Sequence, residues 1–156
     1  MNDWLVGFTD GEGCFSISFN LRKKIKVGIE TRPSFSISQK RDKDLINHKL
    51  VHSLVEFFQG GFIRFSNIDQ IWKYETRNID HICDRIIPFF EKNKLKTAKK
   101  LDFDKFKIVC QMIRSNHHIS HEGILKVIEI SFAMNHYSKR KYSKEFLLKS
   151  LEKVKI

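Results

Sequence analysis

The chain has 156 residues, with 29 Lys and Arg against 18 Asp and Glu, so its net charge is +11. This length predicts one domain or a compact pair of subdomains, and 41% hydrophobic residues are enough to build a core. The charge is typical of a nucleic-acid-binding protein, although a basic soluble protein or one that touches an anionic membrane surface shares it. No apolar run approaches membrane-spanning length, and we expect neither a signal peptide nor a membrane partner.

The residue usage gives two further indications. Cys14, Cys83 and Cys110 are odd in number and lie within apolar patterns, which predicts buried reduced thiols and neither a disulfide framework nor a zinc knuckle. Fourteen Phe against only two Ala, Ala98 and Ala133, indicate an AT-rich genome. We therefore expect an organelle, either mitochondrion or chloroplast, as the place where the protein is encoded and acts.

The first third of the chain predicts a helix followed by two strands. Asp3 is a candidate helix cap before Leu5 and Phe8, and the glycines at 11–13 end this helix. Two alternating runs follow, separated by a basic hinge. The residues predicted to face inward are Phe15, Ile17, Phe19, Leu21, Phe35 and Ile37, and those predicted to face outward are Ser16, Ser18, Asn20, Arg22, Ser36 and Ser38.

The remaining elements are predicted from periodicity and turn signals. Residues 43–58 form an apolar helical stripe that stops at Gly60–Gly61, and a hairpin turns around 67–69. In the last strand Trp72 and Tyr74 suit the core, while Lys73, Glu75 and Arg77 suit the wet face. Asn78 is a candidate cap for a third helix, and helices are expected at about 97–115, at about 121–135 and in a Lys-rich tail from Ser143.

This order predicts an α+β fold, αββαββα with additional C-terminal helices. The four strands form an antiparallel sheet with helices on one face and a polar, basic second face. We expect a single domain over 1–156, with a core at about 1–95 and a helical extension at about 96–156. The polar face is either a surface that contacts base edges and phosphates or an ordinary solvated face, and alternation alone leaves both open.

Acids near the chain start suggest a metal site. Gly7 and Gly11 are four residues apart on one helix face, so a second helix can approach closely there. Glu12 falls at the helix C-terminus, where the helix dipole disfavours a carboxylate and a bound cation would reverse the penalty. Mg²⁺ suits carboxylate and phosphate oxygens. The alternative is a helix–turn–strand joint whose acids only cap and solvate.

The stretch LVGFTDGEG, residues 5–13, resembles the motif of the LAGLIDADG homing endonucleases, with Leu5, Gly7, Asp10 and Gly13 identical to it. The segments FSISQK, PFFEKNKLKTAKKLDF and SHEGI…MN are also similar to this family, so the resemblance covers most of the chain.

The resemblance implies a set of site residues. Motif helices pack against each other, so the expected interface comprises Leu5, Gly7, Phe8, Asp10 and Gly11. Glu12 and the Gly11 carbonyl would hold Mg²⁺, or Mn²⁺ or Ca²⁺ at the same site, and Asp10 would hold the helix end. The remaining catalytic candidates are Gln39, as organiser of the attacking water, Lys99 before Lys96, as the lysine that meets charge on the phosphate, and Lys43, whose role is less secure.

The resemblance also implies a function: metal-dependent hydrolysis of double-stranded DNA by an intron-encoded nuclease. Because only one motif is present, we expect a C2 homodimer that cuts a long pseudo-palindromic site and leaves 3′ overhangs. The expected DNA-contacting residues are Ser16, Ser18, Asn20, Arg22, Lys24, Arg32, Ser36, Ser38, Arg64, Ser66, Lys73 and Arg77. Two alternatives remain open: an RNA maturase that acts on intron RNA, and a catalytically silent DNA-binding protein.

Overall fold

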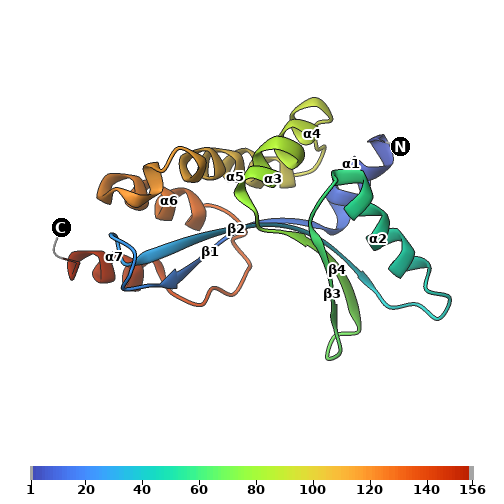
Figure 1. Cartoon of the computed structure of the whole chain (residues 1–156), viewed down its shortest axis with the longest axis horizontal. Coiled ribbons are helices and arrows are strands. Elements are labelled where there is room, and N and C mark those ends of the chain that lie inside the picture. The colour runs from blue at the N-terminus through green and yellow to red at the C-terminus, as the bar shows by residue number, and fades with distance from the viewer. Residues whose placement is uncertain (1, 155–156) are drawn as a thin grey trace. The chain divides into compact units, whose positions relative to one another are not determined.

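A computed structural model describes residues 2–154, and the chain divides into two compact units. The first unit holds the residues up to Phe15 and Ser34–Lys100, and the second holds Ser16–Pro33 and the residues from Leu101 onward. Strands β1 (Gly13–Leu21) and β2 (Ile29–Lys40) each pass from one unit into the other (Figure 1). The strand order is β1-β2-β4-β3, so the predicted α+β fold with a four-stranded antiparallel sheet is confirmed.

The elements of the first unit follow the predicted order. They are helix α1 (Asn2–Glu12), the first part of β1, the second part of β2, helix α2 (Ile46–Phe58), strands β3 (Phe62–Ser66) and β4 (Ile71–Thr76), and a helix in three parts, α3 (Ile79–His81), a π-helical turn (Ile82–Ile86) and α4 (Ile87–Lys92). The Asn78 side chain accepts a hydrogen bond from the His81 N–H at 2.9 Å, which confirms the predicted cap. Asp3 does not cap α1 as predicted, because it lies inside the first turn.

The strand register separates two faces of the sheet. Ile37 pairs with Tyr74, which pairs with Ile63, and these residues belong to the core face. Ser38 pairs with Lys73, which pairs with Arg64, and these belong to the polar face. Period-2 alternation places neighbouring residues on opposite faces, so this register fixes which side chains are available to a ligand.

Aromatic rings fill the core of the first unit. Phe15 stacks on Phe35 with centroids 4.9 Å apart, and the Phe90 ring meets both at a steep angle. Phe58 of α2 stacks on Tyr74 of β4, with ring centroids 5.8 Å apart. Offset and edge-to-face pairs of this kind add to the stabilisation that comes from burial alone.

The second unit holds the β1–β2 hairpin end with helices α5 (Lys99–Arg114), α6 (His121–Phe132) and α7 (Lys144–Glu152), the first two residues of α5 belonging to the other unit. The Arg22 N–H donates to the Gly28 carbonyl at 2.8 Å and closes the hairpin. Ser120 and Ser143 cap α6 and α7 by accepting from backbone N–H groups three residues on.

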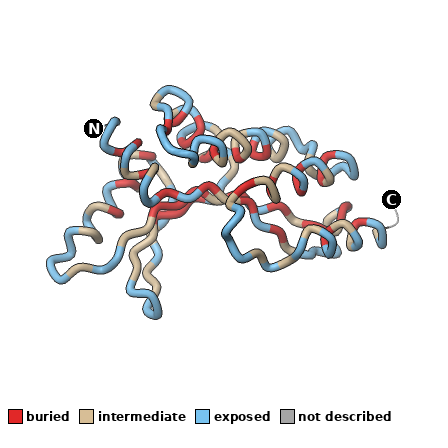
Figure 2. The backbone as a smooth tube through the Cα atoms, turned by 180° about the vertical axis from the view of Figure 1, so that it is seen from behind, coloured by how far each residue is buried: buried red, intermediate tan, exposed pale blue. Residues whose placement is uncertain are grey.

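Buried and exposed residues follow the predicted alternation (Figure 2), except for one leucine and two cysteines. Leu21, predicted to face inward, is 43% exposed at the end of β1, because the strand there runs into the hairpin turn. Of the cysteines only Cys110 is buried; Cys14 is exposed and Cys83 is intermediate, so the prediction of three buried thiols was wrong. Cys14 lies on the polar face of β1, between the buried Gly13 and Phe15.

None of the helices within 2–154 is long and apolar enough to cross a membrane.

Candidate active site

The C-terminal end of α1 is held to the segment that precedes α5 through Asp10. The Asp10 carboxylate accepts hydrogen bonds from the Lys96 N–H at 2.8 Å, the Thr97 N–H at 3.2 Å and the Thr97 hydroxyl at 2.7 Å. Burial opposes ionisation of this carboxyl, but these donors and the nearby Lys99 outweigh it and lower its pKa. Asp10 therefore ties the helix end to this segment, and Thr97 is a partner that the sequence patterns did not reveal.

Lys99 is held at the same helix end. Its Nζ donates to the Thr9 carbonyl at 3.0 Å, and its side chain is partly buried. This carbonyl belongs to the last turn of α1, where carbonyl groups lack helical partners and favour a cation. The Lys96 side chain is exposed, and the contact that Lys96 makes with Asp10 is through its backbone N–H. The geometry thus favours Lys99 over Lys96 as the lysine placed beside the acids.

Glu12 is the last residue of α1, and its side chain is exposed. Gly13 lets the chain turn directly into β1, because a Cβ at that position would lie 2.5 Å from Thr9 Cγ2 and 2.7 Å from the Thr9 carbonyl oxygen. The helix thus ends with an exposed carboxylate next to backbone carbonyls, both of which are hard oxygen ligands.

A divalent ion is compatible with this donor set. Within 2–154 there is no group of three or more His, Cys, Asp or Glu that could hold a metal on its own. Mg²⁺ typically takes one or two carboxylates and completes its shell with waters and substrate phosphate oxygens. Glu12 and the Gly11 carbonyl therefore fit an ion that is shared with a nucleic-acid phosphate, and they do not fit a closed structural metal site.

Gln39 and Lys43 lie near the end of β2. Gln39 lies opposite Trp72 of β4. Phe15 near the start of β1 stacks on Phe35, four residues before Gln39 in β2. Lys43 is exposed in the turn between β2 and α2.

One face of α1 is open. A Cβ on Gly7 or on Gly11 would meet no heavy atom within 4 Å, and Trp4, which is 49% exposed, stacks on Phe8 at 5.0 Å. Leu5, which was expected at a helix–helix interface, is only 1% exposed and packs into the core of its own unit. Trp4 was absent from the expected interface, although its spacing of three and four residues from Gly7 and Phe8 places it on the same face.

The polar face of the first unit carries half of the expected DNA-contacting residues. Arg64 and Arg77 are exposed, whereas Ser38, Ser66 and Lys73 are partly exposed. Ser36 lies on this face but is only 5% exposed, so its side chain is less available than predicted. The neighbouring strand residue Glu75 explains part of this crowding, since it lies opposite Ser36.

Glu75 is an acid buried on this basic face. It is 2% exposed, and its Oε1 accepts from the Ser34 hydroxyl at 2.7 Å and from Arg77 Nε at 3.0 Å. Its Oε2 lies 3.4 Å from an Arg64 guanidinium nitrogen. Burial alone would raise the pKa of this carboxyl, but Ser34 and Arg77 outweigh it and lower the pKa. Glu75 therefore stays ionised and orders two arginines.

The polar face of the second unit carries the other half of the expected DNA-contacting residues. Ser18, Arg22, Lys24 and Arg32 are exposed, and Ser16 and Asn20 are partly exposed. Arg22 pairs with Glu30 at 3.1 Å in a largely solvated contact. These side chains come from the even-numbered positions of β1 and β2 or from the hairpin turn, as the alternation predicted.

Comparisons with known proteins agree with this geometry. The sequence pattern of the LAGLIDADG endonuclease family matches residues 5–110. The chain is 31% identical over 128 residues to "Probable intron-encoded endonuclease 2" of Neurospora crassa, which covers 82% of this chain and 26% of that protein. The chain thus spans about a quarter of the length of this relative. It is also 29% identical to "Probable intron-encoded DNA endonuclease 1" of Mycosarcoma maydis, and the match covers 88% of this chain and 47% of that protein.

Solved structures show the same fold. The crystal structure of the homing endonuclease I-TnaI superimposes with a TM-score of 0.82 at 32% identity, covering 99% of this chain and 98% of that one. I-SmaMI bound to uncleaved DNA target in the presence of calcium ions superimposes with a TM-score of 0.81 at 27% identity, covering 86% of this chain and 45% of that one. Because the family pattern spans more than half of the chain and the fold and the helix end agree with it, this chain belongs to the LAGLIDADG endonuclease family.

Proposed function

We propose that this protein is a site-specific homing endonuclease that hydrolyses both strands of a DNA duplex with the help of a divalent cation. One observation carries the proposal: α1 ends in the exposed carboxylate of Glu12, while Asp10 and Lys99 are fixed around it by hydrogen bonds. An acid kept exposed at the negative end of a helix is costly unless a cation shares the site. I-SmaMI, a structure of the same fold, is bound to uncleaved DNA target in the presence of calcium ions, which supports a role for a divalent ion.

Each side chain then has a role in hydrolysis. A divalent ion held by Glu12 and the Gly11 carbonyl would supply Lewis acidity at a phosphate and a more acidic bound water. The Lys99 ammonium, whose position is set by the Thr9 carbonyl, stabilises the negative charge that develops on the phosphate. Gln39 of β2 orients a water through its side-chain amide. Lys43 and Lys96, both exposed, contribute to the positive potential around the phosphate and make smaller contributions than Lys99.

The protein acts as a C2 homodimer in this proposal. One Glu12 serves one strand, so two copies are needed to cut both strands, and the open α1 face with Gly7 and Gly11 provides a surface for close helix packing. A symmetric pair would contact a long pseudo-palindromic site, and the cuts would leave 3′ overhangs. The 45% coverage of I-SmaMI agrees with a unit of which two are needed.

A glycine substitution tests the dimer. Gly7→Ala places a methyl group in open space within the monomer, so monomer stability should rise by about 0.5–1 kcal/mol from helix propensity. The same methyl group should weaken self-association, which sedimentation equilibrium measures. A Lys126→Ala change on the exposed side of α6 is the matched control that should leave association intact. If wild-type protein stays monomeric at all concentrations and on DNA, the homodimer is wrong.

The decisive experiment for activity is Mg²⁺-dependent cleavage of DNA that carries the uninterrupted target, with Glu12→Gln as the variant. The amide keeps the size but loses the charge, and cleavage should fall at least about 100-fold while DNA binding persists. Wild-type protein that binds the target but never nicks it would instead support a catalytically silent DNA-binding protein. A preference for intron RNA with promotion of splicing would support a maturase.

We also propose that the gene lies in an organelle intron. The AT-favoured residue usage supports this origin, and so do the curated relatives, whose names describe intron-encoded endonucleases. Recovery of the gene from within an intron of purified organelle DNA would test it, and a nuclear copy without an intron context would contradict it.

A further inference from the structure

Two histidines of α2 face each other on the surface of the first unit. His48 and His52 are four residues apart, a spacing that places two side chains on one face of a helix. Their rings meet with centroids 4.2 Å apart and with an angle of 52° between the planes. His52 is exposed and His48 is partly exposed, so an ion can reach the pair from solvent. Neither histidine has a role in the proposed cleavage reaction.

The orientation of His48 is set by the aromatic side chains that it contacts. Trp72 of β4 meets the His48 ring at an interplanar angle of 64°, with centroids 4.3 Å apart. Phe65 of β3 packs against the same Trp72 ring, with centroids 4.5 Å apart. A side chain held in this way loses little further freedom when it binds a ligand, so this packing preorganises the His48 imidazole.

The start of α2 is also fixed. The Asp42 carboxylate accepts hydrogen bonds from the Ile46 N–H at 2.7 Å and from the Asn47 N–H at 3.0 Å. These bonds lie directly before His48, so they hold the turn that carries it in helical geometry. The Asp42 charge also offsets the positive end of the helix dipole, which would otherwise disfavour a cation near His48.

The distance between the two rings fits a divalent transition metal. An imidazole nitrogen binds such an ion at about 2.0–2.1 Å. Two rings on one ion then have centroids about 4.5 Å apart when the two bonds meet at about 90°, and about 5 Å apart at the tetrahedral angle. The observed 4.2 Å is closer to the first value. A right angle between ligands suits Cu²⁺ and Ni²⁺, whereas Zn²⁺ prefers tetrahedral coordination.

The protein contributes only two ligands to this site. Residues 2–154 contain no group of three or more His, Cys, Asp or Glu that could hold a metal, so water would complete the shell of the ion. The imidazole nitrogens also differ from the oxygen ligands at the end of α1, because nitrogen suits Cu²⁺ and Ni²⁺ and oxygen suits Mg²⁺. Ligand chemistry therefore separates the histidine pair from the candidate active site.

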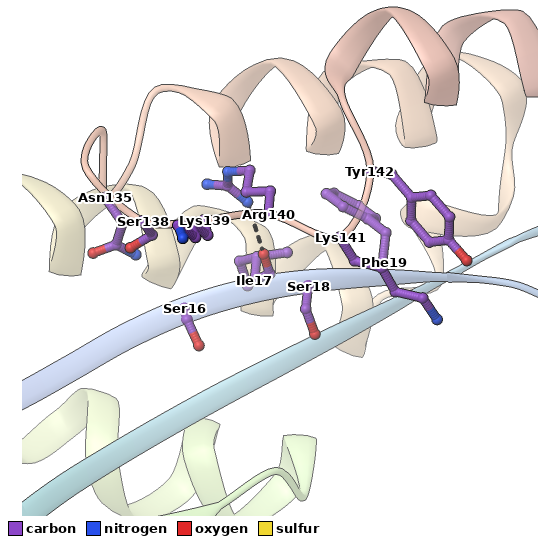
Figure 3. Close-up of a pocket in the computed structure, with 10 residues that line it drawn as sticks. All are labelled: Ser16, Ile17, Ser18, Phe19, Asn135, Ser138, Lys139, Arg140, Lys141 and Tyr142. Atoms are coloured by element: carbon purple, nitrogen blue, oxygen red, sulfur yellow. Dashed lines mark hydrogen bonds between the residues drawn. The ribbon is translucent and has the colours of Figure 1, made fainter. Parts of the chain in front are cut away.

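A cavity in the second unit shows the opposite character. It has a volume of about 230 Å³ and lies between β1 and residues 135–142 (Figure 3). Lys139, Arg140 and Lys141 line it, and Arg140 Nη1 donates to the Ile17 carbonyl at 3.1 Å. The lining residues drawn in Figure 3 include neither an imidazole nor a carboxylate, and their positive charge repels a cation.

We propose that His48 and His52 bind one divalent transition-metal ion per chain as neighbouring nitrogen ligands, with Cu²⁺ bound most tightly and Ni²⁺ next. Affinity at nitrogen sites rises from Ni²⁺ to Cu²⁺ and falls again at Zn²⁺, and the distance between the rings adds a geometric preference in the same direction. The two rings lie together only when α2 is helical, so a bound ion stabilises the folded protein. This inference goes beyond the proposed DNA cleavage and does not depend on it.

Trp72 fluorescence tests the site. Trp4→Phe leaves Trp72 as the only tryptophan of the chain, and its ring contacts His48. CuCl₂ is titrated at about pH 7.5 in a buffer that does not chelate metals, since the ligands must be deprotonated. We expect saturable quenching with one ion per chain. His52→Asn in this background should bind at least about 10-fold more weakly, because the gain from a second linked ligand is lost.

Two further measurements sharpen this test. His121→Asn, which removes an exposed histidine at the start of α6, is the matched control and should leave the quenching curve unchanged. Thermal denaturation with NiCl₂ is the second readout, because Ni²⁺ does not oxidise the exposed Cys14. Ni²⁺ should raise the melting temperature of the wild type, should leave that of His52→Asn unchanged, and should have a larger effect than Zn²⁺ at the same concentration.

Equal quenching in the His52→Asn variant and in its background overturns the inference, because the ion then binds elsewhere on the chain. An unchanged melting temperature of the wild type in Ni²⁺ overturns it as well. Stronger stabilisation by Zn²⁺ than by Ni²⁺ contradicts the right-angle geometry and the proposed order of ions. These measurements contain no DNA, so a failure here leaves the proposed nuclease intact, and a failure of DNA cleavage leaves the histidine site intact.

Discussion

The end of α1 and the polar face of β4 both place a carboxylate among basic side chains, yet the two acids have opposite surroundings. Glu75 on β4 is 2% exposed and is bound by Ser34 and Arg77, with Arg64 beside it. Glu12 at the end of α1 is exposed. A buried acid bound by donors orders its neighbours, whereas an exposed acid at a helix C-terminus retains oxygen ligands for a cation.

Within the α1 end the same contrast recurs two residues apart. Asp10 accepts from Lys96 and Thr97 and so supports the helix end. In the proposed function Glu12 ligates the ion, and the two acids of the motif would divide support and ligation between them. The following changes test this division, from the largest expected effect to the smallest.

Of these four changes, Lys99→Met should have the largest effect, which is a loss of cleavage rate. The variant removes the charge that the Thr9 carbonyl positions, and loss of one preorganised group at a developing negative charge costs about 10²–10³-fold in rate. Single-turnover cleavage with saturating protein measures it. Lys96→Met is the matched control, since that side chain is exposed and its backbone contact survives. Equal losses in both variants would contradict the assignment of Lys99.

Glu75→Gln should reduce stability and disorder two arginines. The amide cannot satisfy Ser34, Arg64 and Arg77 at once, so the free energy of unfolding should fall by about 1–3 kcal/mol, measured by urea denaturation. Affinity for DNA of arbitrary sequence should rise slightly, because a negative charge is lost from the binding face. A variant that is as stable as wild type would show that the carboxylate orders nothing.

Asp10→Asn should lower stability by about 1 kcal/mol near neutral pH, because charge-assisted hydrogen bonds at a partly exposed site are lost. The pKa of Asp10 is below its ordinary 3.8, so its contribution is fully present above that value and is lost as pH falls through the folded pKa. The difference between wild type and variant should therefore vanish in strong acid, as thermal melts at a series of pH values would show. A difference in stability that persists in strong acid would show that the Asp10 side chain acts through packing and not through its charge.

Glu30→Gln should have the smallest effect. Glu30 pairs with Arg22 at 3.1 Å, but the Arg22 side chain is 63% exposed, and such surface pairs contribute between 0 and about 1 kcal/mol. Urea denaturation should place this variant within about 0.5 kcal/mol of wild type. A loss of stability as large as that of Glu75→Gln would show that the solvated Glu30 contributes as much as the buried Glu75.

Much of the fold was predictable because its signals are local. Alternation identified Phe15, Ile17 and Phe19 as buried, and the Asn78 cap was found from residue type and position. The prediction for Leu21 failed because alternation does not reveal where a strand leaves the core. Trp4 was missed at the open α1 face, since periodicity shows a shared face but not which apolar residues stay uncovered.

By itself, the sequence determined the order of elements, the helix that ends in acids and glycines, and the basic polar face, because each depends on neighbours within one turn or one strand. Only the tertiary structure decided which lysine and which acid are held by hydrogen bonds at the end of α1. Lys99 meets Thr9 and Asp10 meets Thr97 across about ninety positions of chain, and such contacts carry no local signal. The burial of Glu75 and the anchoring of Arg140 on Ile17 are products of packing in the same way.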